Sequence, residues 1–181
     1  MGLSISDKAF DFKLIGTDKK EYTLDDFSDK ELLVVIFTCN HCPYAIAYEN
    51  RIKAIQSDYQ NKNVQVIAIN SNDSESHPGD SFDSMIIRSN EKQFNFPYLR
   101  DETQEIALKY GPEVTPDVFL FDKNRNLRYR GRIDDNWDNK KTSSSNDVRT
   151  NIDLLLGNKE IKDSTQKAVG CSIKWKKSHY T

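Results

Sequence analysis

Two cysteines separated by two residues are the feature of this 181-residue chain with the clearest chemical meaning. They are Cys39 and Cys42, in the segment FTCNHCP of residues 37–43. A dithiol with this spacing exchanges with disulfides, because one thiolate attacks and the second thiol lies close enough to release the mixed disulfide. The spacing therefore predicts a redox-active disulfide that needs no further cofactor.

The position of the pair predicts a different role for each thiol. Cys39 is expected to be the exposed attacking thiol at a helix N-terminus, where backbone N–H groups and the helix dipole stabilise a thiolate. Cys42, one turn further on, is then the resolving thiol. A protonated His41 beside the pair would favour the thiolate and make the disulfide more oxidising.

The cysteine pair could also have a purely structural role. Cys39 and Cys42 could be inert core residues, which spacing alone does not exclude. A closed zinc site needs four ligands, usually from two pairs, and Cys171 with His179 lacks the spacing of a second pair. Redox chemistry is therefore the favoured interpretation, and no metal is expected.

A buried strand must precede the pair and a helix must follow it. The apolar run Leu32–Phe37 has strand length and is typical of a central strand. Apolar residues at spacings of three and four then predict a helix over residues 43–60, with Pro43 in its first turn. A second apolar run over residues 64–69 completes a parallel βαβ unit, which positions the cysteines where strand meets helix.

The middle of the chain predicts two further helices. Asp80 or Ser81 can cap the first, and a short segment over residues 96–99 follows it. Asp101 and Gln104 suggest a capped short helix that ends at Gly111.

Hairpins and a last helix complete the expected order. They are a front hairpin of residues 10–14 and 22–27, a hairpin of residues 118–121 and 127–130 with its second strand near the sheet edge, and a helix over residues 148–156.

Composition favours one folded domain over residues 1–181, with a core of residues 8–156 and a tail of residues 158–181 packed on it. The chain has 36% hydrophobic residues and 30% charged residues, and its net charge is only −2. Such a balance gives no global field to attract phosphate backbones or anionic lipid, so neither nucleic acid nor membrane is expected as a main partner. Residues 1–12 lack the pattern of a signal peptide, which leads us to expect a cytoplasmic protein, with a mature secreted form as the alternative; the oligomeric state is left open.

A second motif, VTPDVFLFD of residues 114–122, lies far downstream of the cysteines. With both motifs, the chain resembles the thioredoxin-like superfamily, in its branch of peroxiredoxin-like and TlpA-like redoxins of the AhpC/TSA type. The resemblance spans residues 8–156. It implies an α/β thioredoxin-like fold, with a central mixed β-sheet flanked by helices and an N-terminal β-hairpin extension.

The resemblance also implies a substrate-binding loop. Pro116 is expected to be cis and to face the cysteine pair, and Thr115 to offer backbone hydrogen bonds to a substrate chain, with Asn40 beside them. The implied partners are a disulfide-containing protein or small-molecule substrate and a reductant protein. The implied activity is thiol-disulfide exchange.

Departures from the thioredoxin pattern leave one role unassigned. Thr38 stands where thioredoxins carry a Trp, and Leu33 where they carry a buried acid. The proton acceptor for Cys42 is therefore open, with Glu49, Asp134 and Asp135 as weak candidates.

A thiol-dependent peroxidase is the nearest rival function. Peroxiredoxins carry a Thr three residues before the reactive cysteine, where this chain has Ile36, and an Arg where it has Thr115-Pro116. This rival antioxidant activity is therefore disfavoured.

A Cu(I)-binding assembly factor is a further alternative, since cysteine and histidine suit Cu(I). Those factors have three residues between their cysteines rather than two, and His77 and His179 are distant in sequence.

Cys171 is a candidate third redox cysteine in the tail segment VGCSIKW of residues 169–175. It could fold back to the active site, or it could be a buried small residue that helps Trp175 to dock. The packing role is the favoured prediction, because free cysteine is among the most buried residue types.

Overall fold

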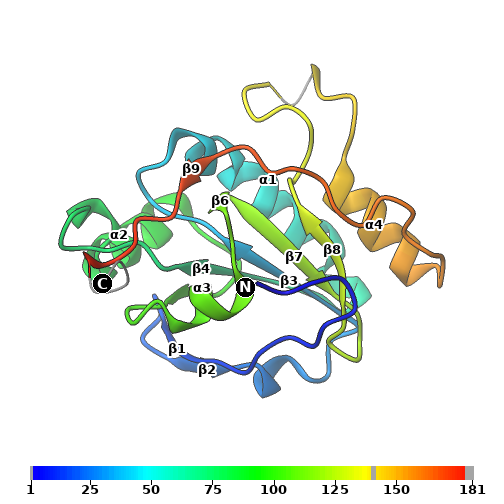
Figure 1. Cartoon of the computed structure of the whole chain (residues 1–181), viewed down its shortest axis with the longest axis horizontal. Helices are drawn as coiled ribbons and strands as arrows, with labels where there is room; N and C mark the ends of the chain where they lie inside the picture. Colours follow the sequence, from blue (N-terminus) through cyan, green and yellow to red (C-terminus); the bar gives the residue numbers. More distant parts are fainter. Residues whose placement is uncertain (1, 140–141, 178–181) are drawn as a thin grey trace.

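A mixed seven-stranded sheet forms the centre of the molecule. The computed structural model describes residues 2–139 and 142–177, so His179 lies outside the described residues. Within that part, the strand order is β2-β1-β5-β4-β3-β7-β8, and β6 and β9 form a separate two-stranded sheet (Figure 1). The strands are β1 (Lys13–Gly16), β2 (Glu21–Thr23), β3 (Leu32–Phe37), β4 (Val64–Asn70), β5 (Tyr98–Arg100), β6 (Val114–Thr115), β7 (Asp117–Phe121), β8 (Leu127–Gly131) and β9 (Cys171–Ser172).

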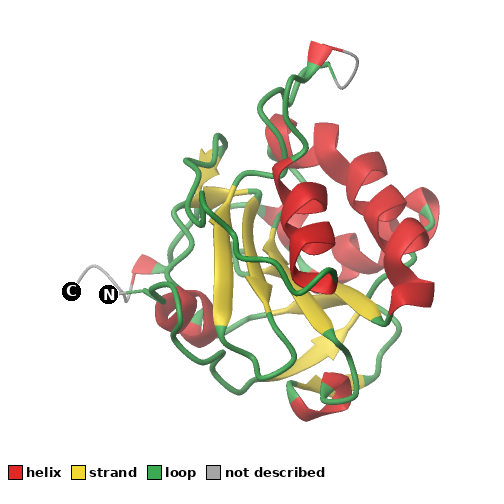
Figure 2. Cartoon of the chain, turned by 90° about the vertical axis from the view of Figure 1, so that its right-hand side faces the viewer, coloured by secondary structure: helices red, strands yellow, loops and turns green. Residues whose placement is uncertain are grey.

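Helices cover both faces of the sheet, with most of them gathered on one side (Figure 2). The α-helices are α1 (Pro43–Tyr59), α2 (Phe82–Lys92), α3 (Glu105–Tyr110) and α4 (Asp147–Leu156). Single 3₁₀ turns occur at η1 (Asp25–Phe27), η2 (Gln60–Lys62) and η3 (Pro78–Asp80). This is the expected thioredoxin-like arrangement of a mixed sheet flanked by helices, which is confirmed.

The alternation of β3 explains why the sheet has two cores. Leu32, Val34 and Ile36 pack with side chains of α1, α2 and α4. Leu33 and the other odd-numbered residues of β3 point the opposite way and pack with α3 and the N-terminal segment. Because every residue of β3 is buried, its sequence is a continuous apolar run instead of an alternating one.

The predicted βαβ unit is confirmed. β3 and β4 pair in parallel over six residues, and α1 crosses between them. Both strands therefore end at the same edge of the sheet, where the cysteine segment follows β3 and the segment of Asn70 to Asn72 ends β4. The carboxyl ends of parallel strands are where such folds bind ligands.

The predicted hairpins are present with shorter strands. β1 and β2 pair antiparallel, but Asp25–Phe27 forms a 3₁₀ turn and not the end of the second strand. β7 and β8 pair antiparallel, and β8 is an edge strand as expected. No helix in the described part of the chain is long and apolar enough to cross a membrane.

The structure confirms the expected starts of two helices, with Ser81 and Gln104 as the N-cap residues. Ser81 caps α2 by accepting a hydrogen bond from the Ser84 amide, whereas the Asp80 side chain points elsewhere. At α3, the Asp101 carboxylate accepts from the Ala107 amide at 2.9 Å. Gln104 is the N-cap residue of α3, but its side chain donates to the carbonyls of Ser71 and Lys174 and not to the helix.

The tail beyond α4 returns across the molecule. It pairs at Thr165 with Arg130 of β8, and then β9 lies beside β6, as the red strand in Figure 1 shows. We call residues 170–176 the C-terminal strap. This strap ends near the turn that follows β4, where the Asp73 amide donates to the Lys174 carbonyl at 2.8 Å.

Candidate active site

Helix α1 begins directly after the second cysteine. Cys42 is its N-cap, with φ −72° and ψ 122°, and Pro43 is the first helical residue. A proline disfavours helical dihedrals in the residue before it, so Cys42 stays extended. The expectation that Cys39 occupies the helix terminus is therefore wrong, because the unpaired N–H groups of the first turn act on Cys42.

Both thiols of the pair are buried. Cys39 is 3% exposed and Cys42 is not exposed at all, and together with Ala45 they form a small buried cluster. The prediction of an exposed Cys39 is wrong, since it lies beneath the loop of Thr115. All three cysteines of the chain are free thiols in this structure.

The loop of Thr115 and Pro116 touches both cysteines. The Thr115–Pro116 bond is cis, as the resemblance predicted. Cys39 Sγ lies 3.3 Å from Thr115 Oγ1, and Cys42 Sγ donates to the Thr115 carbonyl at 3.2 Å. Two segments more than seventy residues apart in sequence thus meet at the sulfur atoms.

The two thiols differ in the groups that stabilise a thiolate. The hydrogen bond from Cys39, which outweighs the cost of burial, holds the pKa of Cys42 below that of a free thiol, with help from Cys171 and the Ala45 amide. The same hydrogen bond, then burial, and to a smaller extent the charge of Asp80 raise the pKa of Cys39. A single negative charge on the pair is therefore favoured on Cys42.

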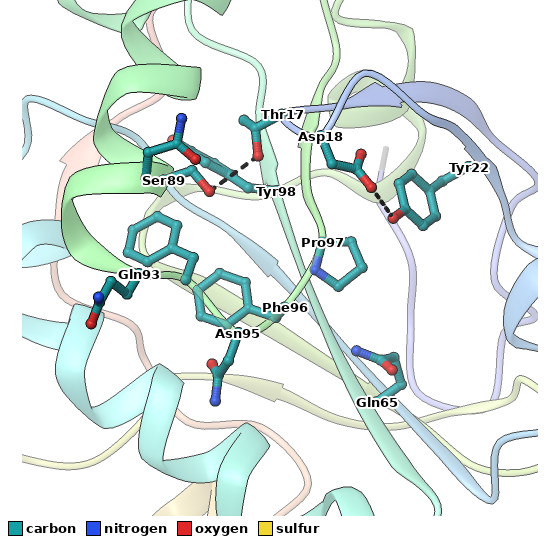
Figure 3. A pocket seen from close by; sticks show the side chains of 12 residues that line it. Thr17, Asp18, Tyr22, Gln65, Ser89, Gln93, Asn95, Phe96, Pro97 and Tyr98 are labelled. Carbon is teal, nitrogen blue, oxygen red and sulfur yellow. Dashed lines mark hydrogen bonds between the residues drawn. The ribbon is translucent and has the colours of Figure 1, made fainter.

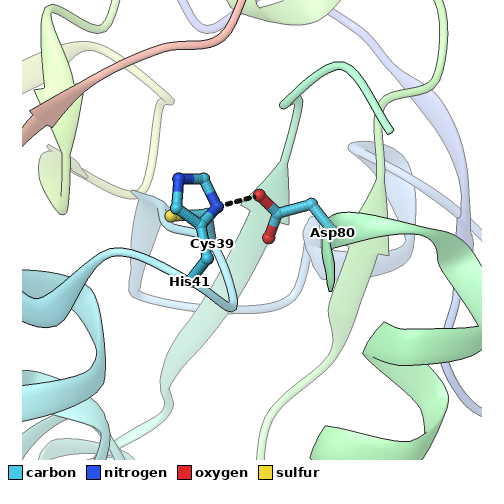
Figure 4. Close-up of side chains that lie close together, drawn as sticks. All are labelled: Cys39, His41 and Asp80. Carbon is cyan, nitrogen blue, oxygen red and sulfur yellow. Dashed lines mark hydrogen bonds and ion pairs between the residues drawn. The ribbon is translucent and has the colours of Figure 1, made fainter. Parts of the chain in front are cut away.

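Asp80 is a buried acid beside the pair that sequence reasoning did not assign to the site. It is fully buried in the turn before α2, and its carboxylate accepts from the Asn40 amide at 2.6 Å. The His41 Nδ1 atom contacts the other carboxylate oxygen (Figure 4). Asn70 and Asn72 also donate to Asp80 through their side-chain amides, at 3.1 and 3.0 Å.

The Asp80 network fixes the two residues between the cysteines. Asn40 is held by its amide and by its side chain, which donates to the Gly79 carbonyl at 2.8 Å and accepts from the Tyr98 hydroxyl at 2.8 Å. The His41 ring stacks on His77 with centroids 4.8 Å apart. His77 is thus close in space, although it is distant in sequence.

The three acids that the sequence offered for Cys42 are engaged elsewhere. Glu49 is ion-paired with Arg88, and Asp134 is ion-paired with Arg51 at 2.9 Å. Asp135 is exposed and accepts hydrogen bonds from the amides of residues 144 and 145. The contacts of Asp80 with Asn40, Asn70 and Asn72 identify it as part of the site. No local sequence pattern predicts these contacts.

Cys39, His41 and Asp80 place their donor atoms within 4.8 Å of one another. Such a group could in principle hold a metal ion. Both oxygens of Asp80 already accept hydrogen bonds from buried N–H groups, however, so a metal would have to displace them. The hydrogen bonds account for the cluster without a metal ion.

Cys171 lies beside the pair on strand β9. Thr115 and Cys171 are directly opposite in the β6–β9 pairing, and the Cys171 side chain packs on the cluster of Cys39, Cys42 and Ala45. It is partly exposed, so the expectation of a fully buried packing residue is wrong.

A pocket of about 490 Å³ has Tyr98 among its lining residues (Figure 3). It is lined by Thr17, Ser89 and Phe96 among others, and Thr17 donates to Ser89 at 3.1 Å. The hydroxyl of the lining residue Tyr98 donates to the Asn40 side chain. None of the cysteines lines it, so the pocket is separate from the dithiol.

Comparison with protein families gives a match over most of the chain. Residues 5–148 match the family described as Redoxin. This range contains both cysteines of the pair and the Thr115–Pro116 loop, but not Cys171. A search of curated proteins gave no match.

Two solved structures are similar over nearly the whole chain. A hypothetical protein from Sinorhizobium meliloti 1021 is 32% identical, with 98% of this chain and 97% of that chain covered and a TM-score of 0.91. An uncharacterized conserved protein from Geobacillus kaustophilus is 35% identical, with 96% and 93% covered and a TM-score of 0.91.

A third structure shares the fold at lower identity. The exposed lipoprotein thioredoxin of Streptococcus pneumoniae strain TIGR4 is 22% identical, with 80% of this chain and 100% of that chain covered and a TM-score of 0.62. At this identity the similarity supports the thioredoxin-like fold alone.

Proposed function

This chain belongs to the redoxin family, and from that premise we propose that it is a thiol-disulfide oxidoreductase that works through the Cys39/Cys42 dithiol. Membership of the family supports thiol-based redox activity. The observation that carries the finer proposal is the contact of both Sγ atoms with the cis-Pro loop, at 3.3 and 3.2 Å from Thr115. Two thiols held against one another and against a peptide edge are suited to disulfide exchange.

The proposed reaction is a two-electron exchange. A thiolate of the reduced pair attacks one sulfur of a substrate disulfide, whose S–S bond breaks, and the departing thiolate takes up a proton. The other sulfur of the pair, once deprotonated, attacks the mixed disulfide and releases the second substrate thiol. The pair ends as the Cys39–Cys42 disulfide, and a reductant returns two electrons and two protons.

The side chains around the pair support a peptide or small-molecule disulfide as substrate. Tyr44 packs on the cysteine cluster, and its ring centroid lies 4.5 Å from that of Trp137. These two partly exposed aromatic rings and His41 give a mixed apolar and polar surface at the site. We propose a disulfide-containing substrate and a reductant protein as the partners.

Peroxide reduction and Cu(I) binding remain alternative outcomes. The residue pattern of peroxiredoxins is missing at Ile36 and Thr115. Cu(I) binding would use Cys39 and His41, but the neighbouring Asp80 carboxylate is a hard ligand that suits Cu(I) poorly.

A direct comparison of substrates tests the proposal. Reduction of insulin disulfides driven by dithiothreitol is measured for the wild type and for Cys39→Ser and Cys42→Ser, in parallel with hydrogen peroxide consumption. We expect the wild type to catalyse disulfide reduction and both variants to lose this catalysis while keeping cooperative unfolding. Rapid peroxide consumption without disulfide reduction would overturn the proposal in favour of a peroxidase.

A further inference from the structure

We propose that Cys171 is a third redox-active thiol, which carries the disulfide of the buried pair to the surface by exchange with Cys42. The proposal rests on the proposed function and names how its site communicates with solvent. Its starting point is the strap. β9 pairs antiparallel with β6, with Cys171 opposite Thr115, and Thr115 Oγ1 donates to the Cys171 carbonyl at 3.4 Å.

Cys42 lies between two sulfur partners. Cys39 and Cys171 both pack against it in one cluster, and both thiols help to lower its pKa. Gly170 permits this approach, because a Cβ atom added there would lie 2.1 Å from the Thr115 carbonyl oxygen. We infer that Cys42 can form a disulfide with either neighbour.

The strap is fixed in place by hydrogen bonds at Lys174, three residues after Cys171. The Lys174 amide donates to the Asn72 side chain at 2.9 Å, and the Lys174 carbonyl accepts from Gln104 at 2.8 Å. Because the strap is held in one conformation, the Cys171 thiol stays beside Cys42. This raises the effective concentration of the Cys171 thiol at Cys42.

Exposure distinguishes Cys171 from the pair. Cys39 and Cys42 are buried, whereas Cys171 is partly exposed. Thiol-disulfide exchange requires access of the attacking thiolate to a sulfur atom. Of the three cysteines, Cys171 is the one with solvent exposure, so we expect a reductant in solution to meet it first.

The exchange balances without a further oxidant. Starting from the Cys39–Cys42 disulfide, the Cys171 thiol loses its proton and attacks Cys42 Sγ, which forms the Cys42–Cys171 bond. The Cys39–Cys42 bond breaks, and Cys39 leaves as a thiolate that takes up a proton. An external thiol or dithiol then attacks Cys171, Cys42 leaves as the thiolate, and a second thiol group releases Cys171 reduced.

Oxidation of the pair changes the electrostatics of the Cys171 thiol. In the reduced protein, burial and the hydrogen bond to Cys42 raise the pKa of Cys171 to about 11. Once Cys42 is in a disulfide it carries no charge, so its part of that shift disappears while Lys174 still favours the Cys171 thiolate. Oxidation of the pair thus favours deprotonation of Cys171, and in the second step the low pKa of Cys42 makes it a good leaving thiolate when an external thiol attacks Cys171.

Disulfide mapping in a chain that lacks Cys39 tests the contact directly. Cys39→Ser, with Cys39→Ala as a second variant, is oxidised with diamide, and the disulfides are mapped by peptide mass spectrometry. We expect an intramolecular Cys42–Cys171 disulfide. In Cys42→Ser, Cys39 and Cys171 should stay unlinked within one molecule. Free Cys42 and Cys171 in the oxidised Cys39 variants would overturn the proposal.

The rate of recharging tests the relay itself. The oxidised wild type and oxidised Cys171→Ser are reduced with dithiothreitol, and the loss of the Cys39–Cys42 disulfide is followed. We expect Cys171→Ser to be reduced roughly tenfold more slowly or worse, since access limits exchange. Equal rates would overturn the relay while leaving the Cys39/Cys42 chemistry intact. Failure of the wild type to form any Cys39–Cys42 disulfide would instead contradict the proposed function.

Discussion

Asp80 is a single carboxylate on which four N–H or ring nitrogen groups converge. The residues that contact it are Asn40, His41, Asn70 and Asn72. An asparagine at this position has one acceptor oxygen and one NH2 group in place of two acceptor oxygens. The NH2 group would therefore face at least one of these donors without forming a hydrogen bond. A buried donor left without a partner costs about 1–3 kcal/mol.

We therefore expect Asp80→Asn to lower the free energy of unfolding by about 2 kcal/mol. Because Asp80 adds to the effects of Cys42 and burial in raising the pKa of Cys39, the variant should also alkylate Cys39 at lower pH. Urea denaturation and the pH profile of iodoacetamide labelling check the two effects. Asp163→Asn, at an exposed carboxylate, is the matched control. Identical behaviour of the two variants would show that Asp80 does not position the site.

Asp117, the residue after the cis proline, gives stability a dependence on pH. It is 2% exposed, and burial raises its pKa to about 6, although the Glu113 amide and Arg130 oppose the shift. Between the ordinary pKa of an aspartate, about 3.9, and pH 6 the folded state binds more protons than the unfolded state. Stability from this group is therefore present at low pH and is lost as the pH rises through 6.

Asp117→Asn should remove this dependence. Two pKa units correspond to about 3 kcal/mol, so the wild type should lose up to about that much more stability than the variant between pH 4 and pH 7. Free energies of unfolding in urea at both pH values measure the difference. Parallel pH dependence in the two proteins would mean that Asp117 titrates normally in the folded state.

At the scale of elements, the strap packs closely against β6 at Gly170, where there is no room for a side chain. The Cβ of an alanine at position 170 would lie 2.1 Å from the Thr115 carbonyl oxygen, which is backbone and cannot rotate away. Gly170→Ala should therefore separate β9 from β6 and cost roughly 1–3 kcal/mol, the usual range for overpacking.

The alkylation rate of Cys171 in the reduced protein measures this separation. We expect a faster rate in Gly170→Ala than in the wild type, because Cys171 leaves its place beside Cys42. Gly79→Ala is the control, since an added Cβ at that position meets nothing within 4 Å. An unchanged rate in Gly170→Ala would show that the strap is not seated on β6 in solution.

Local patterns predicted the elements that carry the pair, but not the contacts between distant segments. The apolar run of β3 and the spacing of apolar residues in α1 were sufficient, because burial of a strand or a helix face leaves a periodic signal in sequence. Pro43 also indicates that Cys42 is the N-cap, because a proline disfavours helical dihedrals in the residue before it. The contact of Asp80 with Asn40, and that of Cys171 with Cys42, join residues far apart in the chain, and single side chains leave no periodic signal.

In the whole molecule, the cysteine pair and the Asp80 network lie at one edge of a sheet that has a hydrophobic core on each face. The carboxyl ends of β3 and β4 hold the cysteine segment and the asparagines that bind Asp80, and the strap closes over the same edge. The net charge of −2 gives little long-range attraction for charged partners. We therefore expect substrates to be selected by contact at this edge instead of by electrostatic steering.

A single turnover followed by disulfide mapping tests the central claim most directly. The reduced protein is mixed with one equivalent of a disulfide substrate, quenched with acid, and digested for peptide mass spectrometry. We predict that one substrate disulfide is reduced for each protein disulfide formed. The protein disulfide should be Cys39–Cys42, or a mixture of Cys39–Cys42 and Cys42–Cys171. Reduction of the substrate without a disulfide at Cys42 would contradict the proposed role of the pair.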